Sequence, residues 1–167
     1  MENQDGSIKI DGNNIIYRGT GYKKVSTSQA IPANLRSFIF KAKIVECSKY
    51  TVMRLGFIFD GGSTRWTNNT EHLSSAKGII TTLESYGGND DICCHLRRIF
   101  TKQKDYQYVK WIKNGKVIGS CMMEGENIFP SIAFDTLHDS IQTAKLEASF
   151  DIELPGNASG KFHMTQK

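Results

Sequence analysis

The sequence predicts an all-β protein, an antiparallel β-sandwich of two sheets. Apolar and polar residues alternate at a period of two along most of the chain, which is typical of half-buried strands. Breaks rich in glycine and asparagine separate these segments, and no stretch combines helical periodicity with capping residues over more than a couple of turns. With 167 residues, 39% of them hydrophobic, the chain is long enough for one domain with a single core.

The strands can be placed in order along the chain. In residues 37–45 the even positions are apolar, and Lys41 and Lys43 lie between them on the opposite face. Residues 51–59 repeat this pattern, and the intervening residues 46–50 are short enough for a hairpin connection. Further strands are expected at 79–83, 91–99, 106–113, 116–122, 128–134 and 140–146.

One turn has a strong local signal, and the two ends of the chain have weak ones. Asn114-Gly115 lies between apolar strands and suits a two-residue type I′ turn, which needs positive φ at both central positions. Residues 1–14 and 155–167 are poor in apolar residues, so we expect each to be a tail or an edge segment. The sandwich itself is predicted to span residues 15–154.

The sequence lacks the motifs of catalysis and metal binding. The four cysteines have no Cys-x-x-Cys spacing, the four histidines are scattered, and no phosphate-binding loop or nucleophile elbow occurs. Asp90-Asp91 follows Gly87-Gly88-Asn89 and is better explained by turn chemistry than by acid–base catalysis. We therefore expect no enzyme activity, no metal and no cofactor.

The first residues and the hydropathy of the chain indicate where in the cell the protein is expected. No apolar run approaches the ~18 residues of a membrane span, and the first residues are polar and acidic rather than those of a signal peptide. We therefore expect an intracellular protein with no contact to a membrane.

The charge of the chain is unevenly distributed. The formal net charge is +4, and the segments 18–54 and 97–116 are rich in lysine and arginine, with Glu46 and Asp105 as their only acidic residues. Most acidic residues lie later in the chain. Such an asymmetry can steer an acidic partner to one side of the protein. Nucleic acid is a weaker possibility, because no continuous basic run or recognised binding signature accompanies the charge. Nothing indicates a small-molecule substrate.

Four segments, in order, resemble a known interaction module, the SPRY domain. Residues 17–32, followed by the strand at 38–45, resemble its opening, and residues 89–94 resemble its Gly-Asp-x-hydrophobic-Gly-Cys segment. Residues 109–119, with Lys-Asn-Gly at the turn, resemble its hairpin, and residues 128–134 resemble its Phe-Pro strand. The resemblance covers roughly residues 15–154, and it implies a noncatalytic module that binds a short peptide.

Within the SPRY family, Gly21-Tyr22 and Arg54-Leu55-Gly56 are most similar to the absent-small-homeotic type, a subunit of histone-lysine methyltransferase complexes. This resemblance implies that Tyr22 and Arg54 lie in a pocket that receives an acidic segment of a WD-repeat partner. It implies an adaptor role in a chromatin complex and a nuclear location. A guanidinium that pairs with a carboxylate beside a tyrosine ring suits such a pocket. The alternative is that Arg54 lies on a solvated strand face and Tyr22 caps the core.

Three lysines are candidates for drawing the acidic partner toward this pocket: Lys23, Lys24 and Lys77. Lys23 and Lys24 directly follow Tyr22, and Lys77 precedes a glycine that opens the expected strand at 79–83. Position 26, where the SPRY family has an arginine, is a serine.

A second candidate site is Arg65-Trp66, in a segment 60–76 that we expect to be a polar loop. Tryptophan and arginine dominate interface hot spots, so this pair could select a partner. The alternative is that Trp66 fills one end of the sandwich. This site underlies two rival functions. One is a SPRY adaptor of the ubiquitin-ligase or Ran-binding-protein type; the other is a carbohydrate-binding jelly roll that stacks a sugar on Trp66.

Overall fold

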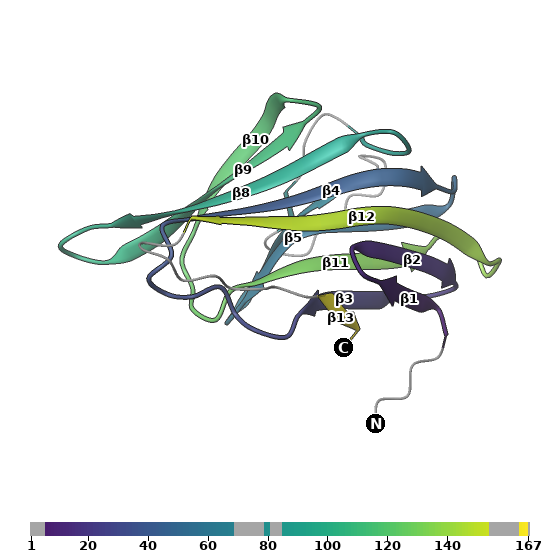
Figure 1. The fold of residues 1–167 in the computed structure, drawn as a ribbon, viewed down its shortest axis with the longest axis horizontal. Helices are drawn as coiled ribbons and strands as arrows, with labels where there is room; N and C mark the ends of the chain where they lie inside the picture. Colours follow the sequence, from purple (N-terminus) through teal and green to yellow (C-terminus); the bar gives the residue numbers. More distant parts are fainter. Residues whose placement is uncertain (1–5, 69–78, 81–84, 154–163, 167) are drawn as a thin grey trace.

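The computed structural model describes residues 6–68, 79–80, 85–153 and 164–166. These residues form thirteen strands in two stacked sheets and no helix (Figure 1), so the prediction of an all-β sandwich is confirmed. In the seven-stranded sheet the spatial order is β1 (Ile8–Asp11), β2 (Asn14–Gly19), β12 (Gln142–Glu153), β4 (Ser37–Cys47), β8 (Asp91–Phe100), β9 (Asp105–Lys113), β10 (Lys116–Met123). In the six-stranded sheet it is β13 (Met164–Gln166), β3 (Lys23–Thr27), β11 (Phe129–Thr136), β5 (Thr51–Phe59), β6 (Gly62–Thr67), β7 (Ile79–Ile80).

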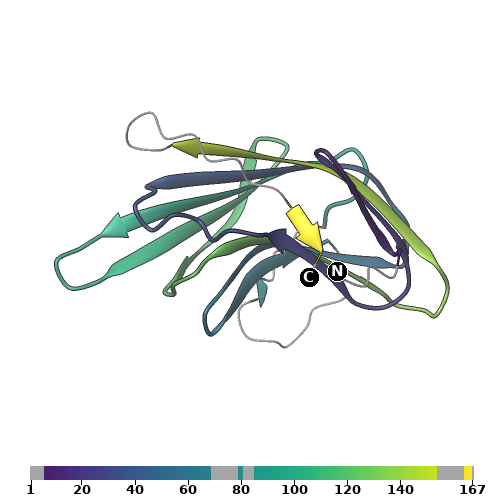
Figure 2. The same cartoon turned by 60° about the horizontal axis from the view of Figure 1, so that its bottom comes forward.

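Pairing is antiparallel throughout, except between β6 and β7, which run parallel over two residue pairs. Many neighbours in the sheets are distant in sequence: β12 pairs with β2 and β4, and β11 pairs with β3 and β5. β1 and β13 are edge strands from opposite ends of the chain, and they contact each other (Figure 2). Long-range pairing of this kind fixes which outward side chains become neighbours.

The core lies between the sheets and consists of the apolar residues that the period-two pattern turns inward. The Tyr17 ring of β2 stacks on the Phe134 ring of β11, with centroids 4.9 Å apart, and so joins the two sheets. The indole nitrogen of Trp111 on β9 donates a hydrogen bond of 3.4 Å to the carbonyl oxygen of Leu55 on β5. Aromatic contacts of this kind add directional packing to the burial of apolar area.

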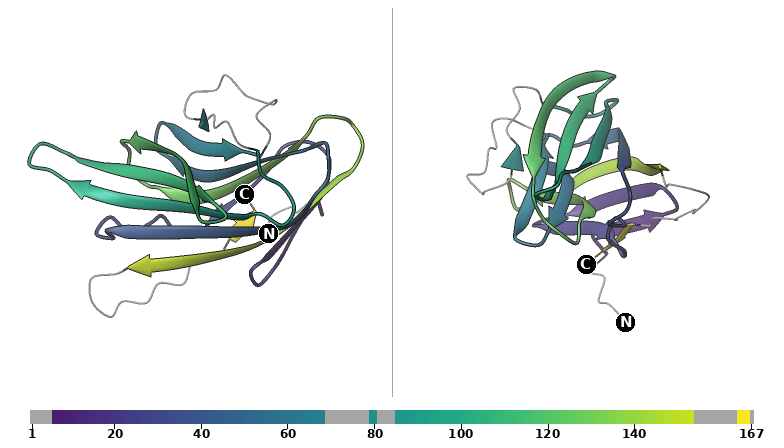
Figure 3. Two further views of the ribbon diagram at one scale, coloured as in Figure 1. Left: turned by 90° about the horizontal axis from the view of Figure 1, so that it is seen from above. Right: turned by 90° about the vertical axis from the view of Figure 1, so that its left-hand side faces the viewer.

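The predicted turn at Asn114-Gly115 is confirmed. Asn114 has a φ of 50° and Gly115 a φ of 85°, and the turn joins β9 to β10. The Asn114 side chain also accepts a hydrogen bond of 2.8 Å from the Asp91 backbone nitrogen and donates one of 2.9 Å to the Asp90 carboxylate. The β8–β9 hairpin projects beyond the rest of the sandwich (Figure 3).

The alternation of apolar and polar residues is a poor predictor of short or polar strands. The polar segment expected to be a loop at 60–76 contains β6, so that expectation is wrong for Gly62–Thr67. Residues 69–76 lie outside the described residues. Pairing with β5 holds β6 in the sheet through a regular register from Arg54↔Thr67 to Phe59↔Gly62. The polar side chains of β6 had masked its alternation.

Candidate functional site

The outer face of the six-stranded sheet carries a compact group of polar and small residues. Leu55 on β5 and Trp66 on β6 point into the core, so Arg54 and Arg65, their neighbours in sequence, point outward. Register places two rows of residues side by side across four strands. We call this surface the Arg54 face, and it comprises Lys24, Ala133, Arg54 and Thr67 in one row and Ser26, Ser131, Gly56 and Arg65 in the next.

Polar atoms on the Arg54 face are buried without hydrogen-bond partners. Among the residues that the structure describes, no partner is found for Arg54 Nε, Arg65 Nε, Thr67 Oγ1 or Ser131 Oγ. Buried polar groups in proteins are nearly always hydrogen-bonded, and leaving one unpaired costs about 1–3 kcal/mol. The four atoms are covered by neighbouring side chains, so they mark a tightly packed polar surface around the two arginines.

A hydrogen bond crosses this face. Arg65 Nη1 donates to the hydroxyl oxygen of Tyr22 at 3.1 Å, and the Tyr22 side chain is 50% exposed. Tyr22 directly precedes β3, whereas Arg65 lies on β6, and β11 and β5 lie between those two strands. The two side chains therefore extend toward each other across the sheet, with Ala133 and Arg54 at the register positions between them. This contact brings Tyr22, Arg54 and Arg65 into one site.

The site has a positive charge excess. Arg54, Arg65 and Lys24 are half-buried, and within the described part of the chain neither arginine has an ion-pair partner. The carboxylate of Asp135, on the same face one row away, accepts a hydrogen bond of 2.8 Å from the Thr136 backbone nitrogen. Arginine offers its donors in a planar fork that matches a carboxylate. The arrangement can therefore bind an acidic group.

Gly56 permits the close approach of β5 and β6 at the centre of the site. A Cβ at this position would collide with the carbonyl oxygen of Thr64 and would lie 2.8 Å from the Cα of Arg65. Only a residue without a side chain therefore allows Arg65 to lie directly beside position 56. Gly56 belongs to the same Arg54-Leu55-Gly56 motif that carried the family resemblance.

Lys23 and Lys24, two of the three candidate lysines, lie on opposite sides of the sheet. Lys24 lies on the Arg54 face, but Lys23 pairs in register with the buried Phe134 and therefore points to the opposite side of the sheet. Lys23 therefore does not lie on the Arg54 face, because neighbours on a strand face opposite ways, and its part in drawing the partner toward the site stays a prediction. Lys77 lies outside the described residues.

The expectation that Trp66 is an exposed hot spot is wrong. Its side chain is 0% exposed, and its ring packs edge-on against Tyr86 with centroids 4.7 Å apart. The Tyr86 hydroxyl donates to the Trp66 carbonyl oxygen at 2.6 Å, which fixes this contact. Trp66 therefore belongs to the core, as the alternative interpretation had it, and cannot stack on a sugar or a partner.

Sequence reasoning missed the small polar residues of the site. Ser131 and Ala133 are fully buried on the outer face of β11, and Thr67 is nearly so on β6. In the sequence, Ser131 and Ala133 alternate with Ile132 and Phe134, which marks them as outward-facing. That signal could not reveal that they lie beside Arg54, because the pairing of β11 with β5 is a long-range feature.

The buried thiols are poor nucleophiles. Burial raises the pKa of Cys47 from 9.0 to about 11, with a smaller opposing effect from its hydrogen bond to Asn68. Burial also raises the pKa values of Cys94 and Cys121. These groups stay protonated at neutral pH, whereas the thiolate is the nucleophile and the metal ligand.

Two further observations limit the chemistry of the described residues. No group of three or more histidine, cysteine, aspartate or glutamate side chains is arranged there to hold a metal ion. Nor is any helix found in that part of the chain that is long and apolar enough to cross a membrane.

Comparison with known proteins supports the fold. No family model matches the sequence, and no curated protein matches it either. A crystal structure of a human SPRY domain superposes with a TM-score of 0.55 over 84% of this chain and 94% of that chain, at 16% identity. The fold is SPRY-like. A functionally unknown protein from Saccharomyces cerevisiae aligns with a TM-score of 0.45 over 92% of this chain and 95% of its own, at 9% identity.

Proposed function

We propose that this SPRY-like domain is a noncatalytic interaction module that binds an acidic peptide of a protein partner on the Arg54 face. The observation that supports the proposal most strongly is that the half-buried Arg54 and Arg65 lie on the same face of adjacent strands, with no ion-pair partner among the described residues. An acidic peptide would supply carboxylates to the accessible parts of these two guanidinium groups.

The binding mechanism follows from the geometry. A carboxylate accepts two hydrogen bonds from the Arg54 guanidinium, since the fork of arginine matches its two oxygens. Arg65, which donates to exposed Tyr22 in the free protein, keeps this contact or transfers a donor to a second carboxylate. Lys24 attracts the peptide from a distance, an effect that salt screens.

A conservative series at position 54 tests the proposal. A fluorescein-labelled peptide rich in aspartate and glutamate is titrated by anisotropy against the wild type, Arg54→Ala and Arg54→Lys. We expect Arg54→Ala to weaken binding by at least about tenfold, since losing one partner of a charged hydrogen-bonded pair costs about 1.5–3 kcal/mol. Arg54→Lys keeps the charge without the fork and falls between the two.

Arg18→Ala is the matched control, because Arg18 is an exposed arginine on β2 in the other sheet. It should leave the affinity unchanged. If Arg18→Ala and Arg54→Ala lost the same affinity for the peptide, binding would depend only on net charge, which would contradict the proposal. An affinity that does not change with salt concentration would also contradict it.

The resemblance to the absent-small-homeotic type names the partner class. We propose that the acidic segment belongs to a WD-repeat subunit of a histone methyltransferase complex, and that the protein acts as a nuclear adaptor. Affinity capture from nuclear extract should recover WD-repeat and SET-domain proteins with the wild type but not with Arg54→Ala. A fluorescent fusion that stays outside the nucleus would contradict the nuclear part of this proposal.

The rival functions lose their main support. Both the adaptor of the ubiquitin-ligase or Ran-binding-protein type and the sugar-binding jelly roll were argued from an exposed Trp66, whose side chain is buried. An uncharged peptide that binds as tightly as the acidic one, with Arg54→Ala having no effect, would restore the first rival.

A further inference from the structure

A second basic surface lies on the other side of the molecule, on the outer face of the seven-stranded sheet. It is a groove of about 880 Å³ across β4, β8 and β9. Its lining includes four basic residues, a histidine and a tyrosine: Arg36, Arg97, Arg98, Lys110, His95 and Tyr108. The two sheets and the core separate it from the Arg54 face, so it is a distinct site.

Register arranges the groove as two adjacent rows of side chains. Arg97 on β8 lies directly beside Tyr108 on β9, and His95 lies directly beside Lys110 in the next row. Lys110 Nζ is 5.8 Å from the centroid of the Tyr108 ring, a cation–π distance. Phe100, at the end of β8, also lines the groove and is 50% exposed. The groove thus combines cations with the half-buried ring of Tyr108 and the exposed ring of Phe100.

The charge of the groove is positive on the β8–β9 side. Among the described residues that line it, none is a carboxylate. Asp151 and Glu153 occupy register positions on β12 opposite Ile39 and Ser37, across β4 from β8 and β9. Asp105, at the start of β9, interacts with Arg98. Arg36, Arg97 and Lys110 are therefore the cations that we assign to a ligand.

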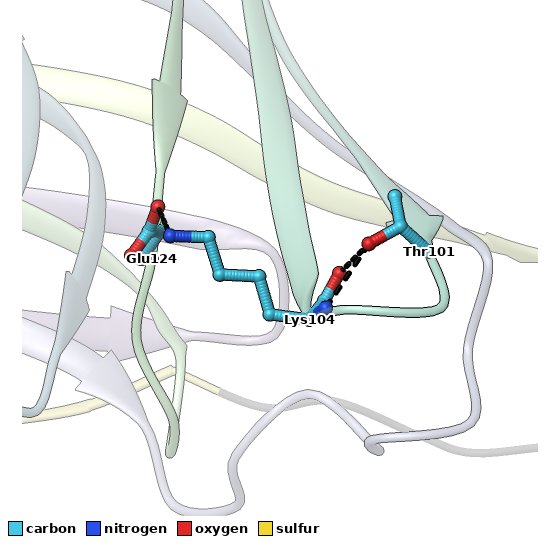
Figure 4. A network of polar contacts seen from close by, with 3 residues as sticks. All are labelled: Thr101, Lys104 and Glu124. Atoms are coloured by element: carbon cyan, nitrogen blue, oxygen red, sulfur yellow. Dashed lines mark hydrogen bonds and ion pairs between the residues drawn. The ribbon is translucent and has the colours of Figure 1, made fainter.

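One lysine at the tip of the projecting hairpin is already paired. Lys104 forms an ion pair of 2.7 Å with Glu124 (Figure 4). Its backbone nitrogen donates a hydrogen bond of 3.0 Å to the Thr101 hydroxyl oxygen. Both members of the ion pair are more than half exposed, so it adds little stability. It does pair Lys104 with a carboxylate, so we do not assign Lys104 to a ligand.

We propose that this groove binds single-stranded nucleic acid. Arg97, Lys110 and Arg36 contact backbone phosphates, and a base stacks on the ring of Tyr108. Sequence-tolerant binding of single strands combines such a basic groove with aromatic platforms, because every base has a flat π face. An acidic peptide would use the cations but would leave the aromatic surface without a matching group, which favours the nucleic acid.

The test is an anisotropy titration with a fluorescein-labelled oligouridine of about 16 nucleotides, the upper end of the site sizes known for single-strand-binding OB folds. We expect Tyr108→Ala to weaken binding by about 5- to 150-fold, since stacking one base is worth that factor, and Tyr108→Phe to retain it. Arg97→Gln should weaken binding and reduce the slope of log K against log salt by about 0.7, as expected for the loss of one phosphate contact.

Two controls separate this site from net charge and from the Arg54 face. Lys9→Gln removes one exposed charge from β1, at the far edge of the same sheet, and should change neither affinity nor slope. Arg54→Ala should leave oligouridine binding intact even where it abolishes binding of the acidic peptide, so the two proposals can fail separately.

Several results would overturn the inference. The first is no binding at low salt, and the second is an equal loss in Lys9→Gln and Arg97→Gln. The third is an affinity for oligouridine that Tyr108→Ala does not change, and the fourth is loss of oligouridine binding in Arg54→Ala. Tighter binding of a labelled polyglutamate than of oligouridine, reduced by Arg97→Gln, would assign the groove to an acidic protein segment instead.

Discussion

The close contact of β5 with β6 makes Gly56 the most informative position for a stability measurement. A Cβ at this position would lie 2.8 Å from the Cα of Arg65 and still closer to the carbonyl oxygen of Thr64. Both obstacles are backbone atoms, which cannot rotate away as a side chain could. The variant Gly56→Ala can therefore fold only if the two strands separate.

The size of the effect follows from that separation. Non-bonded carbon atoms prefer about 3.5–4.0 Å, so β6 must move by about 1 Å. Such a shift breaks the ladder hydrogen bonds on either side of position 56, each worth about 0.5–1.5 kcal/mol. Overpacking adds about 1–3 kcal/mol. We expect the free energy of unfolding to fall by about 2–6 kcal/mol, which lowers Tm by about 4–24 °C for a domain of this size.

Gly62→Ala is the control for this measurement, because Gly62 lies in the same pair of strands. A Cβ there would meet only the Phe59 ring at 3.6 Å, an ordinary contact, and Gly62 has no positive φ. Its stability should stay within about 0.5 kcal/mol of the wild type. Urea unfolding and thermal melting followed by circular dichroism give both values. If Gly56→Ala and Gly62→Ala melted within a degree of each other, the reasoning about strand separation would be refuted.

Three further predictions concern the core, the buried ionisable groups and the hairpin turn. Trp66→Ala should lower the free energy of unfolding by about 3–5 kcal/mol, because it leaves a cavity beside Tyr86; a folded variant of unchanged Tm would disprove this. Burial holds the pKa values of Cys47 and Cys94 above those of the unfolded chain, with that of Cys47 at about 11. The folded state therefore retains protons that the unfolded state loses, so stability measured by urea unfolding should be constant below about pH 9 and should decline toward pH 11; a rise over this interval would contradict it. Asn114→Ala removes two side-chain hydrogen bonds and a residue suited to positive φ, and calorimetry should show a loss of about 1–2 kcal/mol.

The main strands could be predicted because their signal is local. In β4 and β5 the alternation of apolar and polar side chains matches the two faces of a strand, and burial of one face outweighs other preferences. The bounds of β5 were predicted to the residue at Thr51–Phe59. The turn at Asn114-Gly115 is equally local, because few residues other than glycine and asparagine accept a positive φ.

β6 shows where this reasoning fails. Its residues are mostly polar or small, so no apolar alternation marks a strand, and the glycine pair at 61–62, where it begins, suggests a loop. Trp66 consequently appeared to be an exposed residue rather than part of the core. What makes this segment a strand is its pairing with β5, which depends on the absence of a side chain at Gly56. The pattern of residues along one sequence does not show which strands come into such contact.

The sequence alone determined the all-β class, the positions of the long strands and the outward direction of Arg54, since each follows from neighbours within a few residues along the chain. Only the tertiary structure decided that Arg65, Ser131 and Tyr22 gather around Arg54, because β3, β11, β5 and β6 become neighbours through long-range pairing. That pairing is selected by the packing of two entire sheets on one core. No local segment carries enough energy to specify it.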